Sequence, residues 1–294
     1  QGKYEEAEHL YRRSLAIDET IYGSDCPDVA TDLNDWAGLL KSQTRAGKYE
    51  EAGRLCERSL AIHEKAFGPD HPAVATSLNN RAVGKHEEAG RLYERSLAIR
   101  EKAFGPDHPD LASSLNNQAG VLQAQGKYEE AEPLYRRSLA IDEKIYGSDH
   151  PDVATDLNNW AELLESQGKY EEAGRLCERS LAIREKAFGP DHPAVATSLN
   201  TRAGVLQAQG KYEEAGRLCE RSLAIREKAF GPDHPAVATS LNTRAGVLQA
   251  QNKYTEAVKV LERALSIRVR KLGGNHPDTV NSRNNLALVR MSKV

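Results

Sequence analysis

Apolar residues along this chain recur at steps of three and four positions, which is the spacing of an amphipathic helix. In residues 193–209, Val195 and Leu199 fall on one face together with small alanines. A proline opens this window, where a helix tolerates the missing amide hydrogen, and Asp191 or His192 before it can cap the first turn. The pattern predicts a helix over this window.

A second window, residues 211–230, has the same period, with Cys219 and Leu223 on its inner face. Gly210 separates it from the first window, and Gly231 followed by proline ends it. Two helices joined by a tight glycine turn predict an antiparallel hairpin. We call the first helix of each hairpin the A helix and the second the B helix.

This hairpin recurs along the whole chain. The string GKYEEA begins at Gly2, Gly47, Gly126, Gly168 and Gly210, with altered copies at Gly84 and Asn252. From Gly84 onward the copies are 42 residues apart, and residues 168–209 are identical to residues 210–251. Such a period indicates units that bury their apolar faces on one another. We therefore predict an all-α, right-handed superhelical solenoid of antiparallel helix pairs, with about six full repeats, an unpaired helix at each end and fourteen helices in total.

We expect residues 1–294 to form one such array. The repeat boundaries are expected near 24–27, 68–72, 105–109, 147–151, 189–193, 231–235 and 273–277. The first residue is Gln1 and the only methionine is Met291, so we expect the chain to be part of a longer protein.

Two irregularities interrupt the period. Three extra residues, Thr44-Arg45-Ala46, precede one glycine and should lengthen a turn harmlessly. At Arg81–Lys85 the segment RAGVLQAQGK is shortened to RAVGK. The loss of five residues predicts a short A helix and a local defect near Val83, because five is not a whole number of helical turns.

Charge and composition exclude several classes of partner. Charged residues form 28% of the chain, but the net charge is only −3, so there is no basic surface for nucleic acid or anionic lipid. No run approaches the roughly 18 to 20 apolar residues that span a bilayer, and no signal peptide is recognisable. We expect a cytoplasmic protein that binds neither nucleic acid nor membrane.

Histidine and cysteine recur without the spacing of a metal site. Six histidines, His71, His108, His150, His192, His234 and His276, fall once per repeat, each directly before a proline. Neighbouring copies should lie on the order of 10 Å apart, too far to share one ion, so we interpret them as helix caps. Cys56, Cys177 and Cys219 occupy a position that is tyrosine in other repeats, which indicates packing. We predict no metal, no cofactor, no catalytic residue and no small-molecule substrate.

The repeat resembles the tetratricopeptide family, and within it the kinesin light chain-like branch. The resemblance lies in GKYEEA opening the B helix, SLAIREKAFG closing it and DHPAVATSLNN opening the A helix, and it covers nearly all of the chain. Where the family usually has leucine, as at Leu286, this chain has Arg202 and Arg244 in two repeats. Burying an unpaired arginine costs several kcal/mol. We therefore expect Arg202 and Arg244 to reach solvent or to pair with acidic residues.

Asparagine recurs in the middle of every A helix, at Asn34, Asn79, Asn116, Asn158, Asn200, Asn242 and Asn284. Asparagine disfavours a helix by roughly 0.5 kcal/mol, so each copy needs a compensating use. Its amide can bond the backbone of an extended peptide, and the resemblance implies that these residues line a concave groove that holds a ligand. The alternative use is a bond to a neighbouring repeat. The next position adds Asn117, Asn159, Thr201 and Thr243 to the candidate surface.

The first functional hypothesis is a protein-interaction scaffold that binds a peptide or helix in this groove, as the resemblance to kinesin light chain adaptors implies. The second is a ligand-sensing regulatory arm of a larger signalling ATPase whose catalytic domain lies outside this chain. A third is an expanded array with no dedicated partner. No phosphate-binding loop, nucleophile motif or zinc spacing is present, so an enzyme is not expected.

Overall fold

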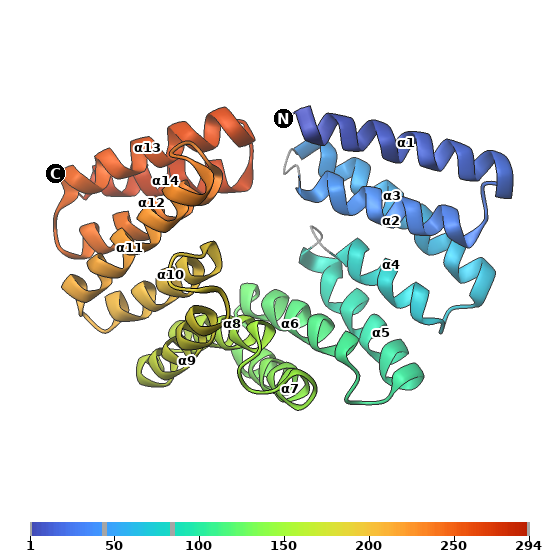
Figure 1. Cartoon of the computed structure of the whole chain (residues 1–294), viewed down its shortest axis with the longest axis horizontal. Helices are drawn as coiled ribbons and strands as arrows, with labels where there is room; N and C mark the ends of the chain where they lie inside the picture. The colour runs from blue at the N-terminus through green and yellow to red at the C-terminus, as the bar shows by residue number, and fades with distance from the viewer. Residues whose placement is uncertain (1, 43–45, 83–85, 293–294) are drawn as a thin grey trace. The chain divides into compact units, whose positions relative to one another are not determined.

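The computed structural model describes residues 2–42, 46–82 and 86–292. These residues form fourteen helices and no strand, which confirms the predicted all-α class (Figure 1). The helices are α1 (Gly2–Tyr22), α2 (Pro27–Ser42), α3 (Ala46–Phe67), α4 (Pro72–Ala82), α5 (His86–Phe104), α6 (Pro109–Ala124), α7 (Tyr128–Tyr146), α8 (Pro151–Ser166), α9 (Tyr170–Phe188), α10 (Pro193–Ala208), α11 (Tyr212–Phe230), α12 (Pro235–Ala250), α13 (Tyr254–Leu272) and α14 (Pro277–Met291). Even-numbered helices are A helices and odd-numbered helices are B helices.

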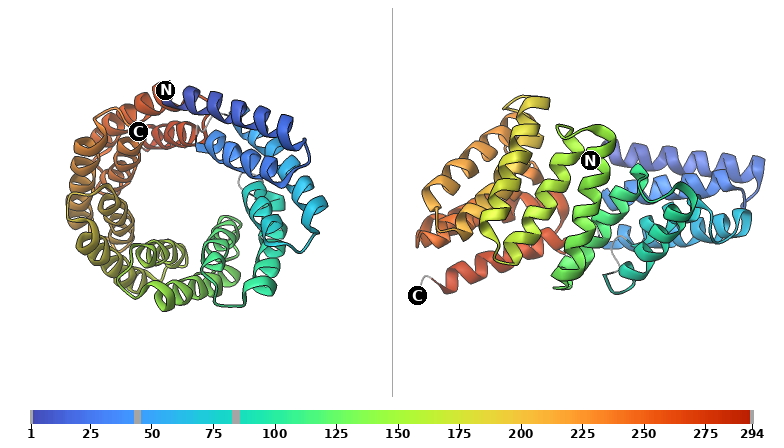
Figure 2. Two further views of the ribbon diagram at one scale, coloured as in Figure 1. Left: turned by 45° about the vertical axis from the view of Figure 1, so that its right-hand side comes forward. Right: turned by 90° about the horizontal axis from the view of Figure 1, so that it is seen from below.

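The chain forms two compact units, Gln1–Ile141 and Asp142–Val294, and the division falls within α7. Successive A and B helices inside each unit run antiparallel and lie side by side (Figures 1 and 2). One uninterrupted domain over residues 1–294 stays a prediction.

In the first unit, α2 packs against α3 and α4 packs against α5. The core of the α2 hairpin contains Leu33, Leu40 and Cys56, all without exposed surface. These residues follow the three- and four-residue spacing of the sequence pattern, so the apolar stripe of each helix is its buried face.

In the second unit, α10 contacts α8, α9, α11 and α12. Val195 and Leu199 of α10 pack with Leu181 of α9 and Ile225 of α11. The α10 helix is therefore buried between its own B helix and the B helix of the preceding repeat, which is how one hairpin covers the next.

Glycine ends the helices where the sequence predicts. Gly210 has φ of +77° and Gly231 has φ of +83°, a conformation that glycine adopts without steric cost. Beside Gly210, the Lys211 amide donates to the Leu206 carbonyl at 2.9 Å, which satisfies one of the free carbonyl groups at the end of α10. The turn between the two helices of a hairpin is thus set locally.

The two irregular repeats differ in what the structure describes. The predicted short A helix is confirmed, because α4 has 11 residues and α10 has 16. Val83, where a local defect is predicted, lies outside the described residues, as do Thr44 and Arg45 of the insertion. Ala46 is the first residue of α3.

Across the described part of the chain, none of the helices combines the length and the apolar character that crossing a membrane requires.

Candidate peptide-binding surface

The recurring asparagine joins neighbouring A helices. Its side-chain amide donates to a serine of the next A helix in five repeats. The pairs are Asn34–Ser77 at 3.0 Å, Asn79–Ser114 at 2.9 Å, Asn158–Ser198 at 3.1 Å, Asn200–Ser240 at 3.2 Å and Asn242–Ser282 at 3.0 Å. Asn116 donates to Ser138 of its own B helix at 2.9 Å. A bond between the asparagine and a neighbouring repeat, which was the alternative to peptide binding, is therefore confirmed.

The burial of the recurring asparagine and of the position that follows it varies from repeat to repeat. Asn34 and Asn158 are only 6% and 3% exposed, whereas Asn117 is exposed and Asn159 and Thr243 are half-buried. Thr201 is buried and donates to the Glu162 carboxylate of α8 at 3.2 Å. The second position is thus more open than the first in α8 but not in α10, and a role of either in peptide binding stays a prediction.

Sequence reasoning missed a buried arginine that completes the contact between repeats. The Arg226 guanidinium donates to the Ala236 carbonyl at 2.9 Å and to the Ser240 hydroxyl at 3.2 Å, and it also reaches the Thr197 hydroxyl at 3.2 Å. Burial lowers the pKa of Arg226. A buried guanidinium is tolerable here because several acceptors replace its water.

A buried serine of the B helix joins the same cluster. Ser222 donates to the Ala196 carbonyl at 3.0 Å and lies 2.8 Å from the Ser240 hydroxyl. We call the group of Asn200, Ser222, Arg226 and Ser240 the polar seam, since it connects α10, α11 and α12. The recurrence of serine and arginine in SLAIR was the available sequence signal.

Equivalent arginines are Arg100, Arg184 and Arg268, and all donate to the serine of the next A helix. In one repeat His63 takes this place, and its Nδ1 lies 2.9 Å from the Ser77 hydroxyl. Burial lowers the pKa of His63, which favours its neutral form. In this seam of the first unit, histidine therefore takes the place of the guanidinium.

The histidines before six of the seven A helices act as caps, as predicted. Nδ1 of each ring accepts the backbone amide two residues later at 3.0 to 3.3 Å, and the residues are His71, His108, His150, His192, His234 and His276. Most rings also stack on the last aromatic residue of the preceding B helix, as Phe188 does on His192 with centroids 4.6 Å apart. No group of three or more metal-ligating side chains occurs among the residues that the structure describes.

The unusual arginines of the A helices pair with acidic residues, which confirms that expectation. Arg202 lies 2.9 Å from Glu178 and 3.6 Å from Glu214, and Arg244 lies 3.2 Å from Glu220. These contacts keep the guanidinium groups near solvent.

The recurring cysteines are packed inside the helix pairs, as their exchange with tyrosine predicts. Cys56, Cys177 and Cys219 have no exposed surface. Burial raises the pKa of Cys177 to about 12, and the nearby Glu165 and Glu162 carboxylates contribute in the same direction. Burial likewise raises the pKa of Cys219 to about 12. Thiols held in their neutral form are inert as nucleophiles.

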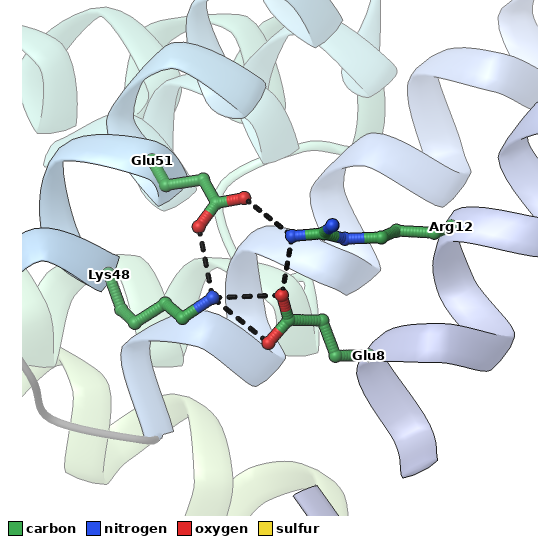
Figure 3. A network of polar contacts seen from close by, with 4 residues as sticks. All are labelled: Glu8, Arg12, Lys48 and Glu51. Carbon is green, nitrogen blue, oxygen red and sulfur yellow. Dashed lines mark hydrogen bonds and ion pairs between the residues drawn. The ribbon is translucent and has the colours of Figure 1, made fainter. Parts of the chain in front are cut away.

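Charges on the B helices pair with one another between repeats. Arginine of one B helix contacts glutamate of the preceding B helix, as in Arg221–Glu185 at 2.7 Å and Arg263–Glu227 at 2.6 Å. Figure 3 shows a second network of ion pairs, near the start of the chain. In this network Glu8 and Arg12 of α1 contact Lys48 and Glu51 of α3. Lys48 lies 2.8 Å from Glu8 and 3.1 Å from Glu51.

The A helices carry carboxylates of a different kind. Desolvation raises the pKa of Glu162 and of Glu165 in α8. Glu162 accepts the Thr201 hydroxyl, and neither carboxylate has a cationic partner within the described ranges. Gln207 and Gln249, at the position of Glu165 in later repeats, are half-buried. This position of the A helices therefore carries polar side chains, and in α8 the Glu162 and Glu165 carboxylates have no cationic partner among the described residues.

Comparisons with known proteins agree with the repeat. A model of the tetratricopeptide repeat matches residues 41–83, 81–144, 110–173, 156–206, 195–268 and 237–292, and a second tetratricopeptide model matches residues 1–28. Two crystal structures of nearly identical TPR-like repeats, from a kinesin light chain-like protein of Podosopora anserina, are similar over 68% of this chain and 97% of theirs. Their identities are 29% and 30%, with TM-scores of 0.56 and 0.54.

BtubC (BKLC) from P. vanneervenii shares the fold, with a TM-score of 0.56 at 22% identity over 81% of this chain and 94% of its own. No curated protein matches this chain.

Proposed function

Because the chain belongs to the tetratricopeptide repeat family, we propose that it is a protein-interaction scaffold that binds an extended peptide or a helix across its A helices, in the manner of a kinesin light chain-like adaptor. One observation carries this proposal. The B-helix charges are largely engaged with each other, whereas the A helices of the second unit hold Glu162 and Glu165 without a cation from the described chain. Polar groups of this kind are available to a partner.

The position after the recurring asparagine is the better candidate for direct contact. Asn159 and Thr243 are half-buried and therefore still reach solvent, and Thr201 lies between them on α10. The first asparagines are engaged with serine, so we assign them to holding the A helices in register, with Asn158, Asn200 and Asn242 as the set in the second unit. A peptide amide or carbonyl would meet the second position first.

The experiment separates the two sets. A displayed peptide library is selected on the 294-residue chain, and enriched peptides are measured by calorimetry against two triple variants. Asn159→Ala/Thr201→Ala/Thr243→Ala should weaken binding about tenfold, on the order of 1.4 kcal/mol, and leave helical content unchanged. Asn158→Ala/Asn200→Ala/Asn242→Ala should instead lower the unfolding temperature.

The control variant is Lys228→Ala on a B helix, where the ion pair with Asp191 at 2.8 Å is exposed and contributes little. Its affinity for the selected peptides should equal that of the parent chain. Selection of no peptide, or peptides whose binding responds to Lys228→Ala and not to the second-position variant, would refute the scaffold proposal for the A helices.

A further inference from the structure

The A helices of the second unit carry another row of side chains beside the recurring asparagine. Positions four and seven after that asparagine lie on the same face of a helix. In α8 these positions are Glu162 and Glu165, and in α10 they are Gly204 and Gln207. The asparagine–serine bonds hold α8, α10, α12 and α14 side by side. We call the row formed by these two positions in the four helices the A-helix strip.

Contacts between neighbouring helices make the strip continuous. A Cβ on Gly204 would lie 3.4 Å from a Glu165 carboxylate oxygen. In the same way, a Cβ on Gly246 of α12 would lie 3.2 Å from the Gln207 side-chain oxygen. The side chain seven positions after one asparagine therefore contacts the residue four positions after the next. A chain laid across the A helices would meet these positions in order.

One end of the strip, on α8, is negative. Glu162 is exposed and Glu165 is half-buried, so both are open to a partner. Desolvation by the surrounding protein raises the pKa of both carboxyl groups, and repulsion from Glu162 raises that of Glu165 further. Asn158, one turn earlier on the same face, is 3% exposed, and its side-chain oxygen accepts no hydrogen bond from the described residues. This unsatisfied acceptor adds to the negative potential beside the two carboxylates.

The other end of the strip, on α14, is apolar. The equivalent positions there are Leu288 and Met291, which are 58% and 75% exposed. They are three residues apart and so lie on one side of the helix. In α10 and α12 the same positions hold glycine and glutamine, so the repeat itself does not require large apolar side chains here. Adjoining exposed apolar residues beside polar ones are typical of a surface that a partner covers.

The two ends together define one kind of occupant. Charge complementarity requires a cation at α8, and burial of Leu288 and Met291 requires an apolar side chain at α14. Helices packed about 10 Å apart place these ends roughly 30 Å from each other, which an extended chain spans with about nine residues. Building on the proposed scaffold function, we propose that the strip binds an extended segment of a partner protein that carries two adjacent basic residues at one end and an apolar residue about nine positions away.

The same positions elsewhere in the chain do not offer this pair of ends. In α2 they hold Gly38 and Lys41, and a cation there repels a basic residue. The glycine and glutamine of α10 and α12 are neutral and match neither end of the segment. Near-identical repeats would otherwise allow several registers, so the carboxylates of α8 and the apolar pair of α14 select one.

Designed peptides test the proposal on the 294-residue chain. Each fluorescein-labelled peptide carries Lys-Arg and Leu-Leu separated by about seven serine and threonine residues, in either order. Matched peptides replace Lys-Arg by Gln-Gln or by Glu-Glu, and fluorescence anisotropy measures the affinities. We expect one order to bind at least about tenfold more tightly than its Gln-Gln match. Added salt should weaken the Lys-Arg peptide, and the Glu-Glu peptide should not bind.

Variants of the chain locate the two contacts. Glu162→Gln/Glu165→Gln keeps the shape of both side chains and removes their charge, so it should abolish the preference for Lys-Arg over Gln-Gln. Leu288→Ala/Met291→Gln should weaken the Lys-Arg and Gln-Gln peptides alike by about tenfold, with the preference for Lys-Arg retained. Circular dichroism verifies that each variant keeps its helical content.

A control variant separates the local effect from net charge. Glu213→Gln/Glu220→Gln removes two exposed carboxylates from the B helix α11 and should leave every affinity unchanged. Equal affinity for the Lys-Arg and Gln-Gln peptides, or a preference for Lys-Arg that survives Glu162→Gln/Glu165→Gln, would overturn the basic segment.

The outcomes also distinguish this proposal from the scaffold function. If library-selected peptides bind the A helices and carry no basic pair, the scaffold function stands and the basic segment is wrong. If neither selected nor designed peptides bind, both proposals are wrong.

Discussion

The α2 helix of the first unit and the α8 helix of the second are near copies that have diverged on one face. Their sequences, PDVATDLNDWAGLLKS and PDVATDLNNWAELLES, differ at Asp35/Asn159, Gly38/Glu162 and Lys41/Glu165. The apolar residues are identical, and Leu33 and Leu40 of α2 are buried like Leu157 and Leu164 of α8, whereas Leu39 is half-buried and Leu163 is buried. The face of the helix that packs against the partner helices keeps the same residues in both copies. The residues on the other face differ in charge, because they do not contribute to that packing.

The difference between Lys41 and Glu165 accompanies a difference in the length of the next A helix, since α4 has 11 residues and α10 has 16. Lys41 donates to the Asn80 carbonyl, close to the end of the shortened α4, and its Nζ lies 3.7 Å from the Cys56 sulfur. A cation is favourable there because the last carbonyl groups of a helix carry partial negative charge. At the same position in α8, Glu165 lies beside Gly204 of α10, which continues to residue 208.

The seams that follow these helices also differ. Arg184 makes three hydrogen bonds across its seam, whereas His63 contacts the Ser77 hydroxyl and the backbone of Pro27. The second unit therefore holds more polar contacts at this junction than the first.

The largest expected effect tests that difference. Arg184→Ala removes all donors of the guanidinium and leaves buried acceptors unsatisfied, which should cost about 2–4 kcal/mol. His63→Ala should cost only about 1–2 kcal/mol, since a neutral ring with fewer hydrogen bonds is lost. Urea unfolding followed by circular dichroism measures both. Equal losses in the two variants would contradict the distinction between the seams.

Reversing the charge in each copy has a smaller expected effect. Lys41→Glu places a carboxylate against the end of α4 and should destabilise the chain by about 1–2 kcal/mol. Glu165→Lys removes a desolvated carboxylate and should change stability by less than about 0.5 kcal/mol. The measurement is again the midpoint of urea unfolding. A larger loss for Glu165→Lys than for Lys41→Glu would show that the short α4 does not need its cation.

A stabilising effect of less than about 1 kcal/mol is expected at a position where the B helices α3 and α9 agree. Gly53 of α3 and Gly174 of α9 occupy helix interiors, and a Cβ at Gly53 meets no atom within 4 Å, while at Gly174 it lies 3.7 Å from the Gln209 side-chain nitrogen. Alanine at either site should stabilise the chain by about 0.5–1 kcal/mol. Thermal unfolding tests this, with Gly231→Ala as the control that should destabilise, because its φ is +83°. Destabilisation at Gly53 or Gly174 would reveal a packing role for glycine.

Local features of the fold were predictable because neighbouring residues decide them. The expected helix over residues 193–209 is observed as Pro193–Ala208, the histidine caps occupy their places, and Arg202 pairs with acidic residues. Proline, glycine and a cap act within one helical turn, so their spacing in the sequence is sufficient.

The polar seam could not be assembled in the same way. Asn200, Ser222, Arg226 and Ser240 come from three helices of two repeats, and no local rule states that they meet. The recurrence of the asparagine, and that of serine and arginine in SLAIR, were visible signals. These signals do not show that the recurring position of a B helix lies against the recurring position of the next A helix.

The sequence by itself determined the helices, their order and their apolar faces, because the period of hydrophobic residues and the glycine and proline positions act over a few residues. Only the tertiary structure decided that the recurring asparagines join neighbouring repeats and that a guanidinium is buried beside them. Those outcomes depend on which helix faces which, and on whether a buried polar group finds its partner across that contact.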